Sequence, residues 1–373
     1  MSENNNPDQN QKKDIKHNTE SEIATNTVIL SMKEWLAVGI SFIALIFFLI
    51  PFVWSIAEKI SIDDNFRINQ DYNEDYWLYK ACAEKASRRF PVLFLGDSVI
   101  WGRFVQNEET IPAYLNTELC TNLFGNIAMN GLHPAAMYGL IRHFGNKVMG
   151  SKVIIHLNPI WMNSIEEDLR GTEEKRINQP RLLPQFTERI PSYQEKIPVK
   201  SGIVMERMIP GLLLANHLRL YYFDGKNFSD WVIDNPEKNP LSCFNFSINP
   251  LQKTNNVRTM RIFTQDWEWI ALGDSLQWSY FQKTISTLKK NENYIFIYVG
   301  SINPYIMTPE SLKKYRKLQE EIKTALAKNG IPFYFCPDLP DVMYADASHQ
   351  VKEGYAYVAK LLAGDSAFRQ WIK

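Results

Sequence analysis

A run of 23 residues without a charged side chain, Trp35 to Ala57, restricts this chain more than any other feature. At about 1.5 Å rise per residue, a helix of that length crosses the roughly 30 Å hydrocarbon layer of a bilayer. Trp35 and Trp54 lie near its ends, where tryptophan commonly anchors a helix at the interface. The run is longer than the core of a cleaved signal peptide, and no small-residue cleavage site follows it. We therefore predict a single-pass transmembrane helix, a signal anchor, over residues 33–58.

The segments that flank this helix suggest an orientation. Residues 1–32 are polar, and we expect them to form a disordered tail. Residues 59–89 are expected to form a linker with a helical lead-in, followed by one large domain over residues 90–373. More lysines precede the apolar run than follow it closely, which favours a cytoplasmic N-terminus and an extracytoplasmic main domain.

Beyond the anchor, short apolar runs alternate with segments of helical pattern. This alternation is typical of an α/β domain in which crossover helices connect the strands of a parallel sheet. Residues 160–270 interrupt it with many prolines and with aromatic residues that follow no clear period. We interpret that stretch as an insertion, either a cap over the site or a membrane-proximal platform. The expected strands lie within residues 91–95, 123–129, 152–157, 294–299 and 331–336.

The overall composition excludes several functional classes. The 373 residues carry no formal net charge, which argues against a nucleic-acid partner, since phosphate binding normally requires a basic excess. The four cysteines are widely scattered, without the spacing of a zinc site or of a disulfide framework. One disulfide in an oxidising compartment stays open as an alternative.

The sequence Gly-Asp-Ser occurs twice, at Ser98 and at Ser275. The first copy follows the apolar run 91–95, which would place Ser98 at the carboxyl end of a buried strand, where open α/β sheets bind ligands. The second copy precedes a helical pattern, where Asp274 or Ser275 is better explained as a helix N-cap. We therefore predict Ser98 as the candidate nucleophile and Ser275 as a cap.

A nucleophilic serine needs a base and a group that orients the base. Asp346 precedes His349 by three residues, a spacing at which the carboxylate reaches Nδ1–H of the imidazole and leaves Nε2 facing Ser98. The competing histidines, His143 and His217, lie in helix-like segments without a nearby carboxylate. The expected triad is therefore Ser98, His349 and Asp346.

This order of motifs resembles the SGNH (GDSL-type) hydrolase family over about residues 90–365, the insertion excluded. The resemblance implies a three-layer, flavodoxin-like parallel sheet, with Ser98 as the nucleophile and Asp346–His349 as its base pair. It also implies an oxyanion hole formed by the N–H groups of Ser98 and Gly131 and by the side-chain amide of Asn158. Donors of this kind contribute roughly 2.7–4 kcal/mol each when negative charge develops on an ester oxygen.

The third family motif differs in this chain. The family usually has Gly-x-Asn-Asp, whereas this sequence has His156-Leu157-Asn158-Pro159. A turn-forming asparagine before a proline is therefore an alternative interpretation of Asn158. His156 in the same strand is better explained as a buried structural residue than as a second base.

The resemblance implies a membrane-anchored serine esterase that cleaves O-acyl esters through an acyl-enzyme and needs no metal or organic cofactor. One alternative is an O-acyltransferase acting on cell-surface polysaccharide, in which Trp101 and Trp161 could stack on sugar rings. For most of the tryptophans, ordinary packing in the core is the interpretation we favour. Another is an inactive glycan-binding or scaffold protein. The expected partners are an ester substrate, with an acylated carbohydrate as one option, and the membrane through residues 35–57.

Overall fold

A computed structural model describes residues 30–62, 66–173, 176–248 and 263–373. The chain divides into two units, with the boundary between Leu45 and Ile46. Of the predicted disordered tail, residues 1–29 lie outside the described residues.

The predicted anchor is a helix from Met32 to Ala57, of 26 residues and mean hydropathy 2.8, long and apolar enough to cross a membrane. It consists of α1 (Met32–Ala44), a π-helical turn (Leu45–Leu49) and α2 (Ile50–Ala57). Pro51 accounts for the wider turn, because it has no N–H to donate to the carbonyl four residues earlier. The start is fixed by a capping box between Ser31 and Glu34.

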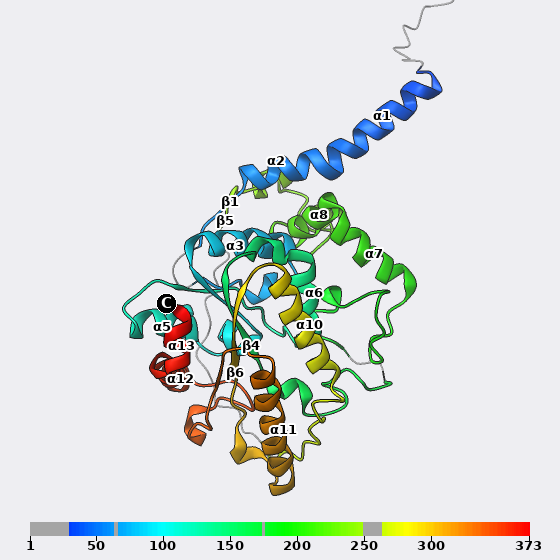
Figure 1. Ribbon diagram of the computed structural model, residues 1–373. Coiled ribbons are helices and arrows are strands. Elements are labelled where there is room, and N and C mark those ends of the chain that lie inside the picture. Colours follow the sequence, from blue (N-terminus) through cyan, green and yellow to red (C-terminus); the bar gives the residue numbers. More distant parts are fainter. Residues whose placement is uncertain (1–29, 63–65, 174–175, 249–262) are drawn as a thin grey trace, which may run out of the picture. The chain divides into compact units, whose positions relative to one another are not determined.

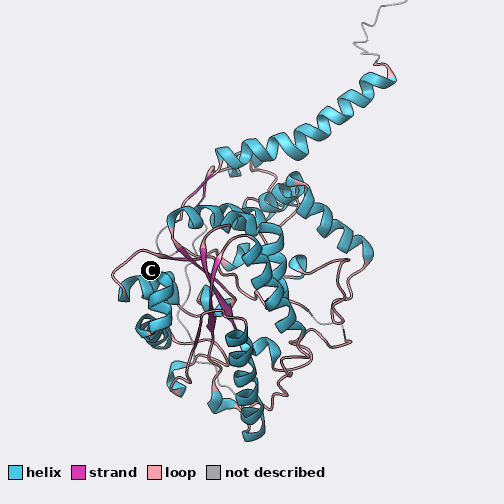
Figure 2. Cartoon of the chain, in the orientation of Figure 1, coloured by secondary structure: helices cyan, strands magenta, loops and turns pink. Residues whose placement is uncertain are grey.

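The second unit contains a five-stranded parallel sheet of order β3-β2-β4-β6-β7 (Figure 2). Numbered among themselves along the chain, these strands have the order 2-1-3-4-5 of a doubly wound α/β sheet. Each of the five predicted apolar runs supplies one of them. The strands are β2 (Val92–Leu95), β3 (Phe124–Asn126), β4 (Lys152–Leu157), β6 (Tyr294–Val299) and β7 (Phe333–Phe335).

Helices cover both faces of this sheet. Successive side chains of a strand point to opposite faces, so the residues of β2 divide between two buried clusters. Leu93 and Leu95 of β2 belong to one buried cluster, and Val92 and Phe94 to another. The first cluster includes side chains of α3 (Tyr76–Arg89), α6 (Pro134–Phe144), α10 (Leu276–Lys290) and α11 (Pro309–Lys328). The second includes α5 (Ile111–Glu118), α12 (Lys352–Gly364) and α13 (Ser366–Ile372).

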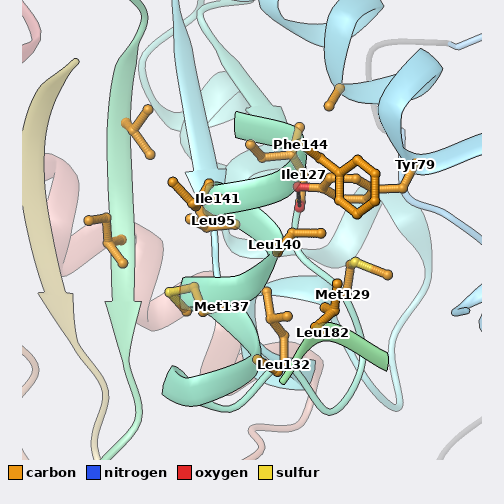
Figure 3. Close-up of a cluster of buried hydrophobic side chains, with 14 of the residues drawn as sticks. Tyr79, Leu95, Ile127, Met129, Leu132, Met137, Leu140, Ile141, Phe144 and Leu182 are labelled. Carbon is orange, nitrogen blue, oxygen red and sulfur yellow. Dashed lines mark hydrogen bonds between the residues drawn. The ribbon is translucent and has the colours of Figure 1, made fainter. Parts of the chain in front are cut away.

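Helix α6 illustrates how the sequence positions these layers. Its apolar residues recur at helical spacing, and Met137, Leu140 and Ile141 belong to the same buried cluster as Leu95 of β2 (Figure 3). Burying such side chains stabilises the fold by roughly 1.5–3 kcal/mol each. The packing holds the carboxyl end of β2 in a fixed position relative to the loop that precedes α6.

The segment between β4 and α10 departs from the simple alternation of strand and helix. It contains α7 (Ile197–Met208), α8 (Pro210–Tyr221), α9 (Phe228–Asp234) and β5 (Ser247–Ile248) (Figure 1). Strand β5 pairs in parallel with β1 (Lys59–Ile60), directly after the anchor helix. Helix α8 packs on α2 and α3.

His217 of α8 lies between two carboxylates, contrary to our expectation that no carboxylate is near it. Its Nδ1 is 2.6 Å from Oδ2 of Asp75, and its Nε2 is 3.0 Å from Oε1 of Glu58. Burial lowers the pKa of His217, but the charges of Asp75 and Glu58 outweigh it and raise that pKa to about 10. Both partners are more than 140 residues away in sequence, so only folding brings them to the histidine.

Candidate active site

The first Gly-Asp-Ser forms a tight turn at the carboxyl end of β2. A Cβ at Gly96 would lie 2.6 Å from Cγ1 of Ile100 and 2.7 Å from Cβ of His156, so only glycine fits between them. Asp97 caps the short helix α4 (Ser98–Trp101) by accepting a hydrogen bond from the N–H of Val99. Ser98 is consequently held at the start of that helix.

The structure brings Ser98, His349 and Asp346 together. Oγ of Ser98 is 2.7 Å from Nε2 of His349, across 251 residues of sequence. Nδ1 of His349 is 2.8 Å from both carboxylate oxygens of Asp346. An imidazole held by a carboxylate at Nδ1 and facing a hydroxyl at Nε2 is the arrangement of a serine hydrolase triad.

A loop between β7 and α12 fixes the acid and the base. Oδ1 of Asp346 accepts hydrogen bonds from the N–H groups of Ser348, at 3.0 Å, and His349, at 2.9 Å. Burial raises the pKa of Asp346, but these bonds and the interaction with His349 outweigh it and lower the pKa below its ordinary value. Asp346 is thus an anion that orients His349.

Asp97, which we did not predict as a site residue, accepts four hydrogen bonds from groups near Ser98. Its Oδ1 accepts hydrogen bonds from the N–H of Val99 and from Nδ1 of His156, both at 3.0 Å. Its Oδ2 accepts from Nδ2 of Asn158 at 2.8 Å and Nε1 of Trp161 at 2.9 Å. Burial raises the pKa of Asp97, but His156 and the other donors lower it to about 2. Its place directly before the serine was the only sequence feature that could have identified it.

The hydrogen bond to Asp97 also explains the role of His156, which stands where the third SGNH motif usually has a glycine. The His156 ring is buried, stacks on Tyr298, and presents Nδ1 to Asp97. Its Nε2 has no hydrogen-bond partner among the described residues. An ionised carboxylate can only accept, so Nδ1 carries the proton of this hydrogen bond. His156 is therefore a buried structural residue in contact with Asp97, as we expected.

The three expected oxyanion donors differ in whether they already donate a hydrogen bond to another protein group. Within the described residues, the N–H groups of Ser98 and Gly131 donate to no protein acceptor, and both residues line the same cavity. Asn158 lines it too, but its amide donates to Asp97 and its Oδ1 accepts from the N–H of Ile160. Asn158 therefore forms the turn before Pro159 and retains one amide N–H for a ligand.

The cavity beside Ser98 measures about 680 Å³, and its lining is polar and apolar in similar measure. Trp161 lies in its wall, whereas Trp101 is buried, with Nε1 donating to the carbonyl of Ile68. Of the two tryptophans considered for stacking on a sugar, Trp101 therefore packs in the core, the alternative that we favoured for most tryptophans. The other lining residues include Asn73, Asn130, Asn163, Asn178, Gln179, Gln265 and Trp267, several of them from residues 160–270.

The second Gly-Asp-Ser has a structural role. Ser275 is the N-cap of α10, and its hydroxyl accepts from the N–H of Trp278 at 3.0 Å. The same hydroxyl donates to the carboxylate of Asp168, which also accepts from the N–H of Leu276 at 2.8 Å. This is the capping role that the sequence predicts for Ser275.

No family model matches the chain, and no curated protein matches it either.

Proposed function

We propose that this protein is a membrane-anchored serine esterase of the SGNH (GDSL-type) hydrolase class that cleaves O-acyl esters. The observation that carries the proposal is the hydrogen-bonded series Ser98–His349–Asp346, at 2.7 and 2.8 Å. The helix Met32–Ala57 supports the anchor, and the lysines that precede it support a cytoplasmic N-terminus.

The chemistry follows from the geometry of these groups. Nε2 of His349 takes the proton of Ser98 as Oγ attacks the acyl carbon, and the imidazolium that forms is stabilised by Asp346. The N–H groups of Ser98 and Gly131, with the remaining amide N–H of Asn158, bind the oxyanion. His349 then protonates the departing alcohol, and a water molecule, activated by the same imidazole, releases the acid.

A second candidate function is acyl transfer to a carbohydrate hydroxyl. The observation that favours it is the cavity, whose asparagine and glutamine side chains and two tryptophans, Trp161 and Trp267, suit a polyhydroxylated acceptor. The acyl-enzyme at Ser98 would be common to both reactions. The difference lies only in whether water or a sugar hydroxyl reacts with it.

The decisive comparison is between the two serines of the repeated motif. Ser98→Ala is expected to abolish hydrolysis of a short-chain ester and labelling by a fluorophosphonate probe. Ser275→Ala, the matched control, is expected to retain both. It should lose about 1 kcal/mol of stability with its cap and a further amount of about 1.5–3 kcal/mol with its hydrogen bond to Asp168. Labelling of the Ser98→Ala protein, with none of the Ser275→Ala protein, would contradict the assignment.

Two further results separate the remaining alternatives. Product analysis with and without a carbohydrate acceptor distinguishes transfer from hydrolysis. A folded wild-type protein that neither turns over an ester nor reacts with the probe would favour the inactive glycan-binding or scaffold alternative.

A further inference from the structure

The end of the anchor helix nearest the main domain has one side covered by protein. Among residues 46–58, Pro51 and Glu58 are buried, Phe47 and Trp54 are half-buried, and most of the others are exposed. The spacing of these four residues, four, three and four, places them on one face of a helix. The globular part of the chain therefore packs along this helix and not only beyond its end.

Helix α8 provides much of that cover, and it approaches the anchor closely. A Cβ at Gly211 would lie 2.8 Å from Cα and from Cδ1 of Phe47 and 3.0 Å from the carbonyl oxygen of Ile46, so only glycine allows α8 to approach the helix this closely. Small residues allow this kind of close approach between helices in membranes. Six residues further along α8, His217 contacts Glu58, at the other end of the same stretch. Helix α8 thus contacts the anchor near Phe47 and again at Glu58, and α2 and α8 lie side by side in Figure 1.

In a bilayer that the anchor helix spans, this contact places the start of α8 below the membrane surface. Ten residues of helix separate Phe47 from Ala57, the last residue of the candidate span, which corresponds to about 15 Å. Even at a tilt of about 40°, the depth of Phe47 below Ala57 would be about 11 Å. Because Gly211 touches Phe47, the corner between α7 and α8 would lie at that depth.

The surface of this corner has the composition that such a position requires. Between residues 201 and 215, the exposed residues are Gly202, Met205, Met208, Pro210 and Ala215, none of them charged. Met205 and Met208 are 52% and 74% exposed. In a helix that faces water, the exposed side normally carries the charged residues.

Two of the three charged residues of α7, Glu206 and Arg207, are directed toward the protein. The third, Lys200, is half-buried, with Nζ 4.9 Å from the centre of the Tyr193 ring. Glu206 pairs with Arg181, and Arg207 donates to the carbonyl oxygens of Arg181 and Leu183. Both Glu206 and Arg207 are half-buried. Helix α7 therefore has its polar side inward and its apolar side outward, the arrangement of a helix that contacts lipid.

From these observations we propose that the α7–α8 corner, residues 202–215, is inserted into the lipid bilayer beside the anchor helix. The main domain is then held by two elements, a spanning helix and a re-entrant helical corner, which fixes its orientation relative to the membrane surface. The inference rests on the proposed membrane anchor but not on the proposed chemistry. Its occupant is lipid, because the corner meets the anchor helix at Phe47, directly before residues 48–56, whose exposed side chains are almost all apolar.

The test measures the contact of single labelled positions with lipid in the full-length chain. Cys120 and Cys243, the native thiols that are not buried, are replaced by serine. A cysteine is then introduced at Met208, and in separate proteins at Met205, Phe52 and Lys313, and labelled with an environment-sensitive fluorophore. Phe52 reports the anchor, and Lys313 reports a charged, exposed face of α11. Each protein is reconstituted in phosphatidylcholine nanodiscs with and without brominated acyl chains.

We expect brominated lipid to quench the labels at Met208 and Met205 at least half as strongly as the label at Phe52, and to leave that at Lys313 unchanged. Quenching at Phe52 without quenching at Met208 and Met205 would overturn the inference, whether water, a second copy or another protein covers the corner. Absence of quenching at Phe52 would overturn the anchor and the inference together. Esterase activity is not part of the readout, so failure of the proposed chemistry would be seen separately.

Discussion

The substitution Asp97→Asn tests how the candidate site is held together. Each oxygen of Asp97 accepts hydrogen bonds from two donors, four in all. An asparagine at this position has one acceptor oxygen, so in either orientation its NH₂ group faces two N–H donors. Hydrogen bonds to a charged group contribute about 1.5–3 kcal/mol each, which gives an expected loss of about 3–6 kcal/mol. His156 can relieve one clash by moving its proton to Nε2, where the described residues offer no acceptor.

The same substitution is expected to reduce catalysis, because Asn158 loses the acceptor that orients its amide. One misplaced oxyanion donor corresponds to a fall in kcat of about 10²–10³-fold. The assays are chemical denaturation in detergent micelles and hydrolysis of a short-chain ester. Trp161→Phe is the matched control, because it removes one of the four donors and keeps the charge. It is expected to cost at most half as much stability, and it supplies a measured value if Asp97→Asn yields no folded protein. Stability within about 1 kcal/mol of wild type and kcat within about threefold for Asp97→Asn would refute the reasoning.

Three further predictions follow from named contacts. Asp346→Asn is expected to lower kcat by on the order of 10⁴-fold with little loss of fold, because the imidazole loses the anion that sets its tautomer; an unchanged kcat in the ester assay would contradict this role. His217→Gln is expected to cost about 3–5 kcal/mol near neutral pH, because Asp75 and Glu58 are left buried without a cation. Since the folded pKa of His217 is raised to about 10, this contribution is complete below its ordinary pKa of about 6.5 and is lost as the pH rises through 10. Denaturation of wild type and variant at pH 6, 8 and 10 should therefore show a shrinking difference, and a constant or growing one would exclude the mechanism. Gly96→Ala is expected to destabilise the protein by about 1–3 kcal/mol, because its Cβ would lie 2.6 and 2.7 Å from neighbouring side-chain carbons, and an unchanged denaturation midpoint would show that the turn has room for it.

Much of the architecture was predictable because it depends on local pattern. The uncharged run up to Ala57 predicts a helix of membrane length, and the structure has a helix from Met32 to Ala57. Five short apolar runs predict a parallel sheet, and each supplies one strand of it. The cap at Ser275 and the spacing of Asp346 and His349 are equally local, since capping and a three-residue turn involve neighbouring backbone groups.

Most contacts between distant segments were beyond the reach of the sequence, apart from that of Ser98 with His349, which the order of motifs implied. Asp97 gathers donors from β4 and from the turn after it, and His217 lies between carboxylates more than 140 residues away, because folding creates these neighbours and no spacing records them. Trp101 shows the same limit, since its position beside the site in sequence gave no warning that its ring packs inward. Periodicity and capping thus determined the elements of this protein, whereas the partners of its buried polar groups were decided by tertiary structure, since a buried charge must be paired wherever the chain brings a partner to it.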